Sequence, residues 1–350
     1  MISINNRIQA FVSLGKLLLA VGSNNIKGNK QVEKLNKAVV DSVNYNGWFI
    51  EDNVRYMFAS IGNGLTEDNI DIWITSYKKE LLLSKEVKTI GVVMAGNVPI
   101  VGFHDFLSIL ISGNKVLAKL SSDDNKLLPI IAELLIEIEP GFANMIEFTD
   151  GRLTGFDAII ATGSNNTSRY FEYYFGKYPN IIRKNRNSVA LLTGDETDDE
   201  LQGLSKDIFM YYGLGCRNIS HILIPENYNF DRLFKVIERN EEIVKNHKYF
   251  NNYEYNKAIY LVNGKKHFDT GNLLITEDGS FSSPVSVLHY SYYKDIDVAG
   301  RFLEVSSSQI QCIVTASNVA KNAVVPGNSQ FPELWDYADG VDTMQFLTEL

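Results

Sequence analysis

Short apolar segments that alternate with helical segments are the feature that most constrains the fold of this chain. Residues 89–95, 115–120, 157–161 and 188–192 are apolar runs, each of a length that suits one buried strand. Helical patterns of about 10–15 residues lie between the first three runs, as in βαβ units. The sequence therefore predicts an α/β protein with a parallel, doubly wound sheet.

The second half of the chain predicts another α/β lobe. A helix is expected over residues 199–211, followed by a glycine-rich segment and further strands near residues 220–224, 285–290 and 309–314. We expect a first lobe over residues 1–186, which starts with a mostly helical part, and a second lobe over residues 187–318. Residues 319–350 are expected to pack back on the first lobe as an ordered tail, without a regular element from Pro326 onward.

Helix boundaries follow from capping residues at the strand ends. Asn97 is a good N-cap for the helix after the first strand, and Gly113 ends that helix. Ser121 or Ser122 is expected to cap the next helix. Pro129 falls inside this second helix, so either the helix begins later or it is kinked.

Composition excludes several classes of function. The net charge is −9 and the pI near 5.2, which argues against non-specific binding to nucleic acid. Two cysteines are too few for a disulfide framework, so a reduced, cytoplasmic protein is expected. The apolar run over residues 11–21 contains Lys16 and reads as a surface helix rather than a signal peptide. No run approaches the ~20 apolar residues of a membrane span.

Cys216 is the strongest candidate for a nucleophile. Gly213 and Gly215 let the backbone turn sharply near it, and Arg217 follows it directly. A nearby cation raises the thiolate fraction of a cysteine. The alternative is a small buried apolar side chain, which is what most free cysteines are. Cys312, in an apolar strand, is expected to belong to the core.

Other candidates lie at the ends of the predicted strands. Asn97 suits an oxyanion partner for a cysteine, although a plain N-cap is the commoner role. The turn at residues 162–164 suits pyrophosphate binding at a helix N-terminus, and Lys119 suits a ribose or phosphate contact. The histidines show no metal-ligand spacing, and we interpret them as structural, with His104 and His221 the first to test.

These segments occur in a recognisable order. The chain reads Asn97-Val98-Pro99, then GNKVLAKLS over residues 113–121, TGS over 162–164, Gly215-Cys216, and SPV over 283–285. This order resembles the aldehyde dehydrogenase superfamily. Longer strings at residues 98–106, 116–122, 215–220 and 336–344 resemble its LuxC branch, the fatty-acyl-CoA reductases, more closely.

The resemblance implies an aldehyde-dehydrogenase-like fold of two Rossmann-like lobes with mostly parallel sheets. It implies Cys216 as the nucleophile and Asn97 as an oxyanion-hole amide. The implied cofactor contacts are made by Lys119, Ser121, Thr162, Gly163 and Ser164. The cofactor implied is NADPH, with NADH as the alternative, and the substrate is an acyl-CoA, most simply a fatty acyl-CoA. A homo-oligomer or an acyl-transferring partner enzyme is compatible with this family.

Two departures from the superfamily pattern sharpen the hypothesis. Ile182 stands where the superfamily has its general-base glutamate, and Ser280 stands near its cofactor-contacting glutamate. Without a base, water is poorly activated to hydrolyse a thioester. We therefore expect reduction of an acyl-CoA to the aldehyde through an acyl-Cys216 thioester. The alternatives are an oxidative NAD(P)-dependent aldehyde dehydrogenase and a catalytically silent acyl carrier or scaffold.

Overall fold

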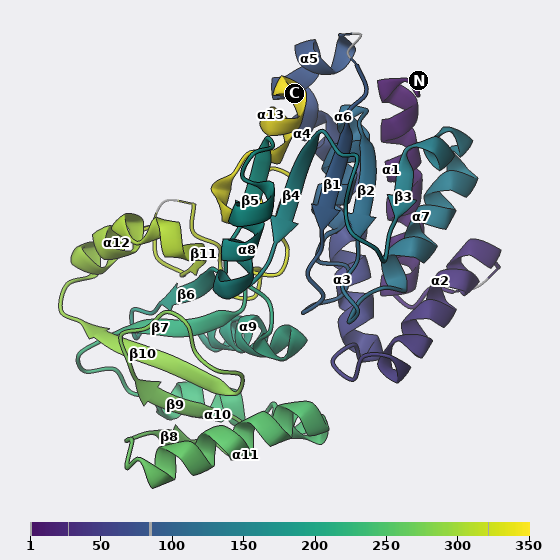
Figure 1. The fold of residues 1–350 in the computed structure, drawn as a ribbon. Coiled ribbons are helices and arrows are strands. Elements are labelled where there is room, and N and C mark those ends of the chain that lie inside the picture. The colour runs from purple at the N-terminus through teal and green to yellow at the C-terminus, as the bar shows by residue number, and fades with distance from the viewer. Residues whose placement is uncertain (1, 27, 84–85, 321) are drawn as a thin grey trace. The chain divides into compact units, whose positions relative to one another are not determined.

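The computed structural model describes residues 2–26, 28–83, 86–320 and 322–350 (Figure 1). The chain folds into two compact units. The first comprises Met1–Lys184 and Pro332–Leu350, and the second comprises Asn185–Phe331.

The first unit is built on a five-stranded parallel sheet. Its spatial order is β3 (Ile146–Phe148), β2 (Lys115–Lys119), β1 (Thr89–Val93), β4 (Ala158–Thr162) and β5 (Asn180–Arg183). The chain runs outward from β1 through β2 to β3 and resumes on the other side of β1 with β4. The strand order therefore reverses between β1 and β4, which is where sheets of this kind bind ligands.

Helices cover both faces of this sheet. They are α1 (Ile4–Gly22), α2 (Lys30–Asp41), α3 (Glu51–Gly64), α4 (Glu67–Ile74), α5 (Lys78–Leu82), α6 (Phe103–Ser112), α7 (Leu127–Ile138), α8 (Asn165–Phe175) and α13 (Thr343–Glu349). Apolar side chains of α1, α6 and α7 join Ile90 and Val116 of the sheet in the main core. Phe175 of α8 packs on the opposite face, against Leu117 and Ile159.

The second unit has a six-stranded sheet. Its order is β11 (Ile310–Val314), β6 (Asn187–Leu191), β7 (Ile219–Pro225), β10 (Val287–Tyr293), β9 (Leu274–Glu277) and β8 (Phe268–Asp269), and only the β8–β9 pair is antiparallel. The helices are α9 (Asp198–Phe209), α10 (Asp231–Glu238), α11 (His247–Val262) and α12 (Ile296–Val305). The predicted α/β class with mostly parallel sheets is confirmed.

The two predicted N-caps are wrong. Helix α6 begins at Phe103 with Gly102 as its cap, because Ile100 has a left-handed backbone (φ +45°) that interrupts any helix starting at Asn97. Helix α7 begins at Leu127 rather than after Ser121 or Ser122. Pro129 therefore lies in the first turn, where its missing N–H has no intrahelical acceptor to lose, and the later start is confirmed. Gly113 does end α6, in the left-handed conformation (φ +88°).

The tail contains a helix that the sequence analysis missed. Asp342 caps α13 by accepting a hydrogen bond from the backbone N–H of Gln345, and Met344 and Leu347 are buried. An amphipathic helix is recognised in a sequence when its apolar residues repeat over about three helical turns. Helix α13 has 7 residues, or about two turns, so this repeat is missing. No helix among the described residues is long and apolar enough to cross a membrane.

Candidate active site

Cys216 lies at the tip of a tight turn between α9 and β7. The backbone N–H of Asn218 donates to the carbonyl of Gly215 at 3.0 Å, so Cys216 and Arg217 are the two central residues of this turn. The Cys216 side chain is exposed and is not in a disulfide. The alternative expectation of a small buried apolar side chain is therefore wrong for Cys216, whereas Cys312 is buried as predicted.

Asn218 organises the Cys216 turn, and the sequence analysis missed it. Its side chain is 3% exposed. The Nδ2 group donates to the carbonyls of Asp207 (3.0 Å) and Met210 (2.8 Å), and Oδ1 accepts from the N–H of Gly215 (2.8 Å). One amide therefore satisfies the end of α9 and shapes the turn that presents Cys216. The only signal in the sequence was an asparagine two residues after the cysteine.

The segment before the Cys216 turn has an unusual backbone. Tyr211, Tyr212 and Gly213 have successive positive φ values of 51°, 60° and 75°. Each tyrosine in this region costs about 1–2 kcal/mol relative to ordinary backbone. Both tyrosines are buried, at 2% and 6% exposure, so their packing offsets that cost. Strain of this kind tends to occur beside functional sites.

Arg217 points toward the other cysteine. Its Nε donates to the carbonyl of Ser329 at 2.5 Å, and Nη2 lies 3.9 Å from Sγ of Cys312. Ser188 donates its hydroxyl to the carbonyl of Cys216 at 2.9 Å. The turn is thus anchored at both central residues, and the guanidinium of Arg217 makes its side-chain contacts on the Cys312 side.

The other site residues expected from the sequence lie in the first unit, at one edge of its sheet. Asn97 follows β1, Lys119 ends β2, Ser121 follows it, and Thr162 ends β4. The carboxyl ends of these parallel strands share an edge, which is the ligand-binding edge of a doubly wound sheet. Asn97 is exposed in the bend after β1, and Gly102 rather than Asn97 is the N-cap of α6.

The start of α8 suits an anionic ligand. Ser164 caps this helix by accepting a hydrogen bond from the N–H of Thr167 at 3.2 Å, and the first turn carries no acidic residue. A Cβ on Gly163 would lie 2.9 Å from the Phe171 ring, so glycine allows the close approach of strand end and helix. Lys119 Nζ donates to the carbonyl of Gly151 at 3.0 Å, at the same edge. A helix N-terminus with a nearby lysine fits a dinucleotide phosphate.

A buried ion pair lies beside Ile182 at the end of β5. Arg183, which follows Ile182 in β5, binds Asp105 of α6 through both Nη atoms, at 2.5 and 2.8 Å. Nη2 also donates to the hydroxyl of Thr343 at 2.9 Å. Three segments far apart in the sequence therefore meet at the end of β5. The sequence analysis gave these residues no role.

His104 has a structural role in the first unit. Its Nε2 is 2.8 Å from the carbonyl of Leu334, and its ring lies 5.6 Å from those of Trp73 and Tyr337. Burial lowers the pKa of His104, so the ring is neutral at pH 7. The contacts of His104, together with the hydrogen bond from Trp73 to the Tyr337 hydroxyl, hold residues 334–337 in place.

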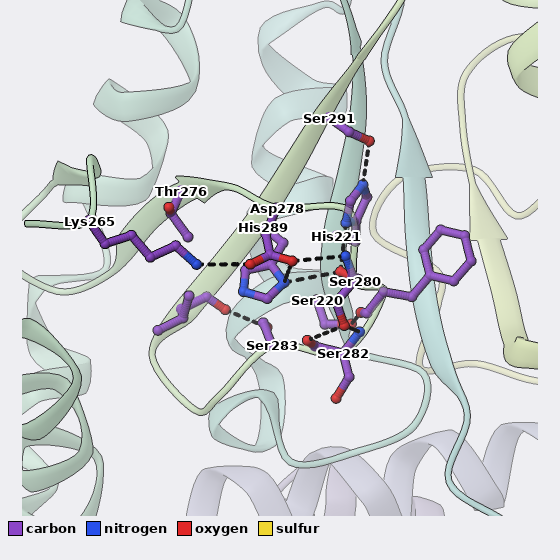
Figure 2. A network of polar contacts seen from close by, with 12 residues as sticks. Ser220, His221, Lys265, Thr276, Asp278, Ser280, Ser282, Ser283, His289 and Ser291 are labelled. Carbon is purple, nitrogen blue, oxygen red and sulfur yellow. Dashed lines mark hydrogen bonds and ion pairs between the residues drawn. The ribbon is translucent and has the colours of Figure 1, made fainter. Parts of the chain in front are cut away.

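His221 and His289 hold the loop that contains Ser280. Figure 2 shows the two rings side by side, each with Nδ1 directed at the carbonyl of Ser280, at 2.9 and 3.0 Å. Nε2 of His221 is 2.8 Å from the hydroxyl of Ser291, and Asp278 binds Lys265 at 2.8 Å. Ser280 itself is exposed. The loop that contains Ser280 is therefore held by two histidines through one backbone carbonyl.

Acid is expected to weaken the second unit through His221. Burial lowers its pKa from 6.5 to about 4, and the side chain is 0% exposed. The neutral ring stabilises the fold fully above pH 6.5, and this contribution is lost as the pH falls toward 4, because the unfolded chain binds the proton first. At 1.36 kcal/mol per pKa unit the loss is about 3 kcal/mol.

Urea unfolding followed by circular dichroism, from pH 7.5 to 4.5, measures this loss. The free energy of unfolding should decline less steeply with falling pH for His221→Gln than for wild type. His247→Gln, at an exposed position, should follow the wild-type decline, and parallel curves for all three proteins would refute the assignment.

No group of three or more potential metal ligands occurs in the part of the chain that the structure describes.

Solved structures of aldehyde dehydrogenases have the same fold. Aldehyde dehydrogenase 21 from Physcomitrella patens, in complex with succinate, aligns with a TM-score of 0.66 and 12% identity over 98% of this chain and 84% of its own. An NAD-dependent benzaldehyde dehydrogenase from Corynebacterium glutamicum aligns with a TM-score of 0.65 and 12% identity over 93% of this chain and 80% of its own. For an NAD-dependent aldehyde dehydrogenase from Sinorhizobium meliloti the TM-score is 0.65 and the identity 12%, over 93% of this chain and 74% of its own. No protein-family model and no curated protein sequence matches this chain.

Proposed function

Given the aldehyde dehydrogenase fold, we propose that the chain is an acyl-CoA reductase that uses NADPH and forms an aldehyde. The observation that carries the proposal is the exposed Cys216 at the tip of a turn with a fixed shape. A thiol in that position is accessible to a thioester carbonyl, and its exposure is unusual for a free cysteine. The substrate class and the direction of reaction come from the LuxC resemblance and from Ile182 in place of the general base.

In the proposed reaction Cys216 attacks the thioester carbonyl of the acyl-CoA as a thiolate. The Asn97 amide and the Cys216 backbone N–H stabilise the oxyanion that forms. The C–S bond to CoA then breaks, CoA leaves as its thiolate, and an acyl-Cys216 thioester remains. After hydride addition to that carbonyl, the thiohemiacetal loses aldehyde and restores the cysteine. Covalent catalysis thus divides one difficult reduction into two easier steps.

In this proposal the first unit binds the dinucleotide. The N–H groups at the start of α8 would hold the pyrophosphate, with Thr162, Gly163 and Ser164 forming the turn. Lys119 and Ser121 would contact the adenosine ribose. The nicotinamide supplies the hydride. Two of the structural neighbours are NAD-dependent by name, so NADH is the competing choice.

Oxidation of an aldehyde to an acid is the second candidate, because aldehyde dehydrogenases share the fold. That reaction needs water activated at the acyl-enzyme stage. Ile182 offers no proton acceptor there, and the neighbouring Arg183 is bound to Asp105. The acyl group on Cys216 is therefore better suited to hydride than to water.

Cofactor consumption with acyl-CoAs of graded chain length tests the proposal. NADPH should be consumed with one equivalent of aldehyde and one of free CoA released, and NADH should be slower. Incubation with aldehyde, NADP⁺ and no CoA should give little acid. Acid formed rapidly without CoA would instead favour the oxidative candidate. If no acyl-CoA gave turnover or an acyl adduct, the proposal would be refuted in favour of a catalytically silent scaffold.

Replacing Asn97 with alanine is expected to lower kcat by about 10²–10³-fold, because one oxyanion donor is lost. The KM for NADPH should change little, since Asn97 is assigned to the acyl carbonyl. Steady-state kinetics with saturating acyl-CoA measures both values. Asn251→Ala, at an exposed position of α11, is the matched control and should keep wild-type kcat. Equal kcat for Asn97→Ala and wild type would remove Asn97 from the mechanism.

A further inference from the structure

Asp124 has a buried carboxylate, and only one of its two oxygens accepts a hydrogen bond. The side chain is 5% exposed. Oδ2 accepts a hydrogen bond from the N–H of Ile100 at 2.5 Å, whereas Oδ1 is buried and has no hydrogen-bond partner. Burial raises the pKa of Asp124 to about 6, and the hydrogen bond from the N–H of Ile100 opposes this rise. A buried carboxylate with an unpaired oxygen is costly, so its position calls for a reason.

Capping of α7 does not explain this arrangement. Leu127 is the first residue of α7, and no side-chain hydrogen bond caps that helix. The bond to Ile100 reaches across to a different segment, the bend between β1 and α6.

Ile100 needs support because of its backbone. It is a β-branched residue with φ +45°, a region that such side chains rarely adopt, and it is 3% exposed. Its N–H is held by Asp124, and its carbonyl accepts from the N–H of Phe103 at 2.9 Å. Both polar groups of the strained residue are thus fixed.

The backbone conformation of Ile100 affects the position of Asn97, because the two residues between them, Val98 and Pro99, have little conformational freedom. Pro99 has a fixed φ, and it restricts Val98 before it to extended backbone. On the other side of Asn97, a Cβ on Gly96 would lie 2.6 Å from the Cβ of Ser121. The loop at residues 121–124 therefore contacts both flanks of Asn97, by packing at one end and by a hydrogen bond at the other.

We propose that Asp124 is a positioning residue that holds the bend of residues 96–100 in its strained shape and so directs the Asn97 amide at the reacting carbonyl. The catalytic part of this inference rests on the proposed function. Because Ser121 belongs to the same loop, the cofactor-binding edge and the oxyanion donor share one support. Asp124 itself is too buried to touch the substrate.

Two substitutions test the contact with Ile100. In Asp124→Ser the shorter side chain no longer reaches the N–H of Ile100, so kcat should fall by about 10- to 100-fold with KM little changed. Asp124→Asn keeps an oxygen acceptor for Ile100 and should restore most of kcat. Asp71→Asn, at an exposed position of α4, should match wild type. Loss of kcat in Asp124→Asn equal to that in Asp124→Ser would overturn the proposal.

The pathway through Asn97 is tested in a double-mutant cycle. If Asp124 acts through Asn97, Asp124→Ser should reduce kcat in the wild-type background and have little further effect in Asn97→Ala. An equal fold-loss in both backgrounds would contradict that pathway.

Crystal structures of wild type and Asp124→Ser test the positioning without any catalytic assay. The proposal predicts that Ile100 returns to negative φ in the variant and that Asn97 moves with it. An unchanged bend would overturn the proposal, even if the wild-type chain proved to reduce acyl-CoA. A changed bend in a chain that reduces no acyl-CoA would instead leave the positioning intact and refute the proposed function.

Discussion

Alanine at position 216 is expected to abolish aldehyde formation from acyl-CoA, with kcat falling by at least about 10⁴-fold, as for other nucleophile deletions. The reason is that Cys216 is assigned every covalent step of the proposed reaction. The fold should be unaffected, since the side chain is exposed and outside the core. NADPH consumption with saturating acyl-CoA, measured beside circular dichroism, tests both statements.

Cys312→Ala is the matched control, because Cys312 is the chain's only other cysteine and is buried. It should retain aldehyde formation, although its contact with Arg217 makes some loss of stability reasonable. Normal turnover in Cys216→Ala, or loss of turnover only in Cys312→Ala, would show that Cys216 is not the nucleophile.

Asp105→Asn is expected to reduce the free energy of unfolding of the first unit by about 3–5 kcal/mol. The substitution leaves the Arg183 guanidinium buried without its carboxylate, and Arg183 is 5% exposed. All three tryptophans, Trp48, Trp73 and Trp335, belong to the first unit, so their fluorescence in urea reports on this unit alone.

Glu133→Gln provides the comparison for the buried ion pair, because it lies in the same unit. Glu133 binds Lys34 at 2.8 Å with both side chains exposed, so its loss is expected to change stability little. A small effect of Asp105→Asn, similar to that of Glu133→Gln, would show that the Asp105–Arg183 pair does not support the first unit.

The strands could be predicted from the sequence because each is a short, nearly continuous apolar run. Residues 89–95 and 115–120 contain β1 and β2, and residues 188–192 overlap β6. Buried parallel strands have this composition since both faces are covered. Short strands such as β3 and β8 escaped, because two or three residues carry no period.

The candidate site was only partly accessible from the sequence. Cys216 stood out because glycines surround it, and a motif order pointed to Asn97. Asn218 and Asp124 did not stand out, because their roles depend on hydrogen bonds to backbone groups of other segments. Asn97 was assigned to a helix cap because local propensity favours it, and the left-handed Ile100, which excludes that cap, has no signature in residue type.

The acyl-enzyme tests the central claim most directly. Incubation with an acyl-CoA in the absence of NADPH should increase the intact mass by one acyl group, and peptide mapping should place it on Cys216. Addition of NADPH should then discharge the adduct as one equivalent of aldehyde in a single turnover. An adduct that NADPH cannot discharge, or that is released as free acid, would contradict the assignment of Cys216 as the carrier of an acyl group that awaits hydride.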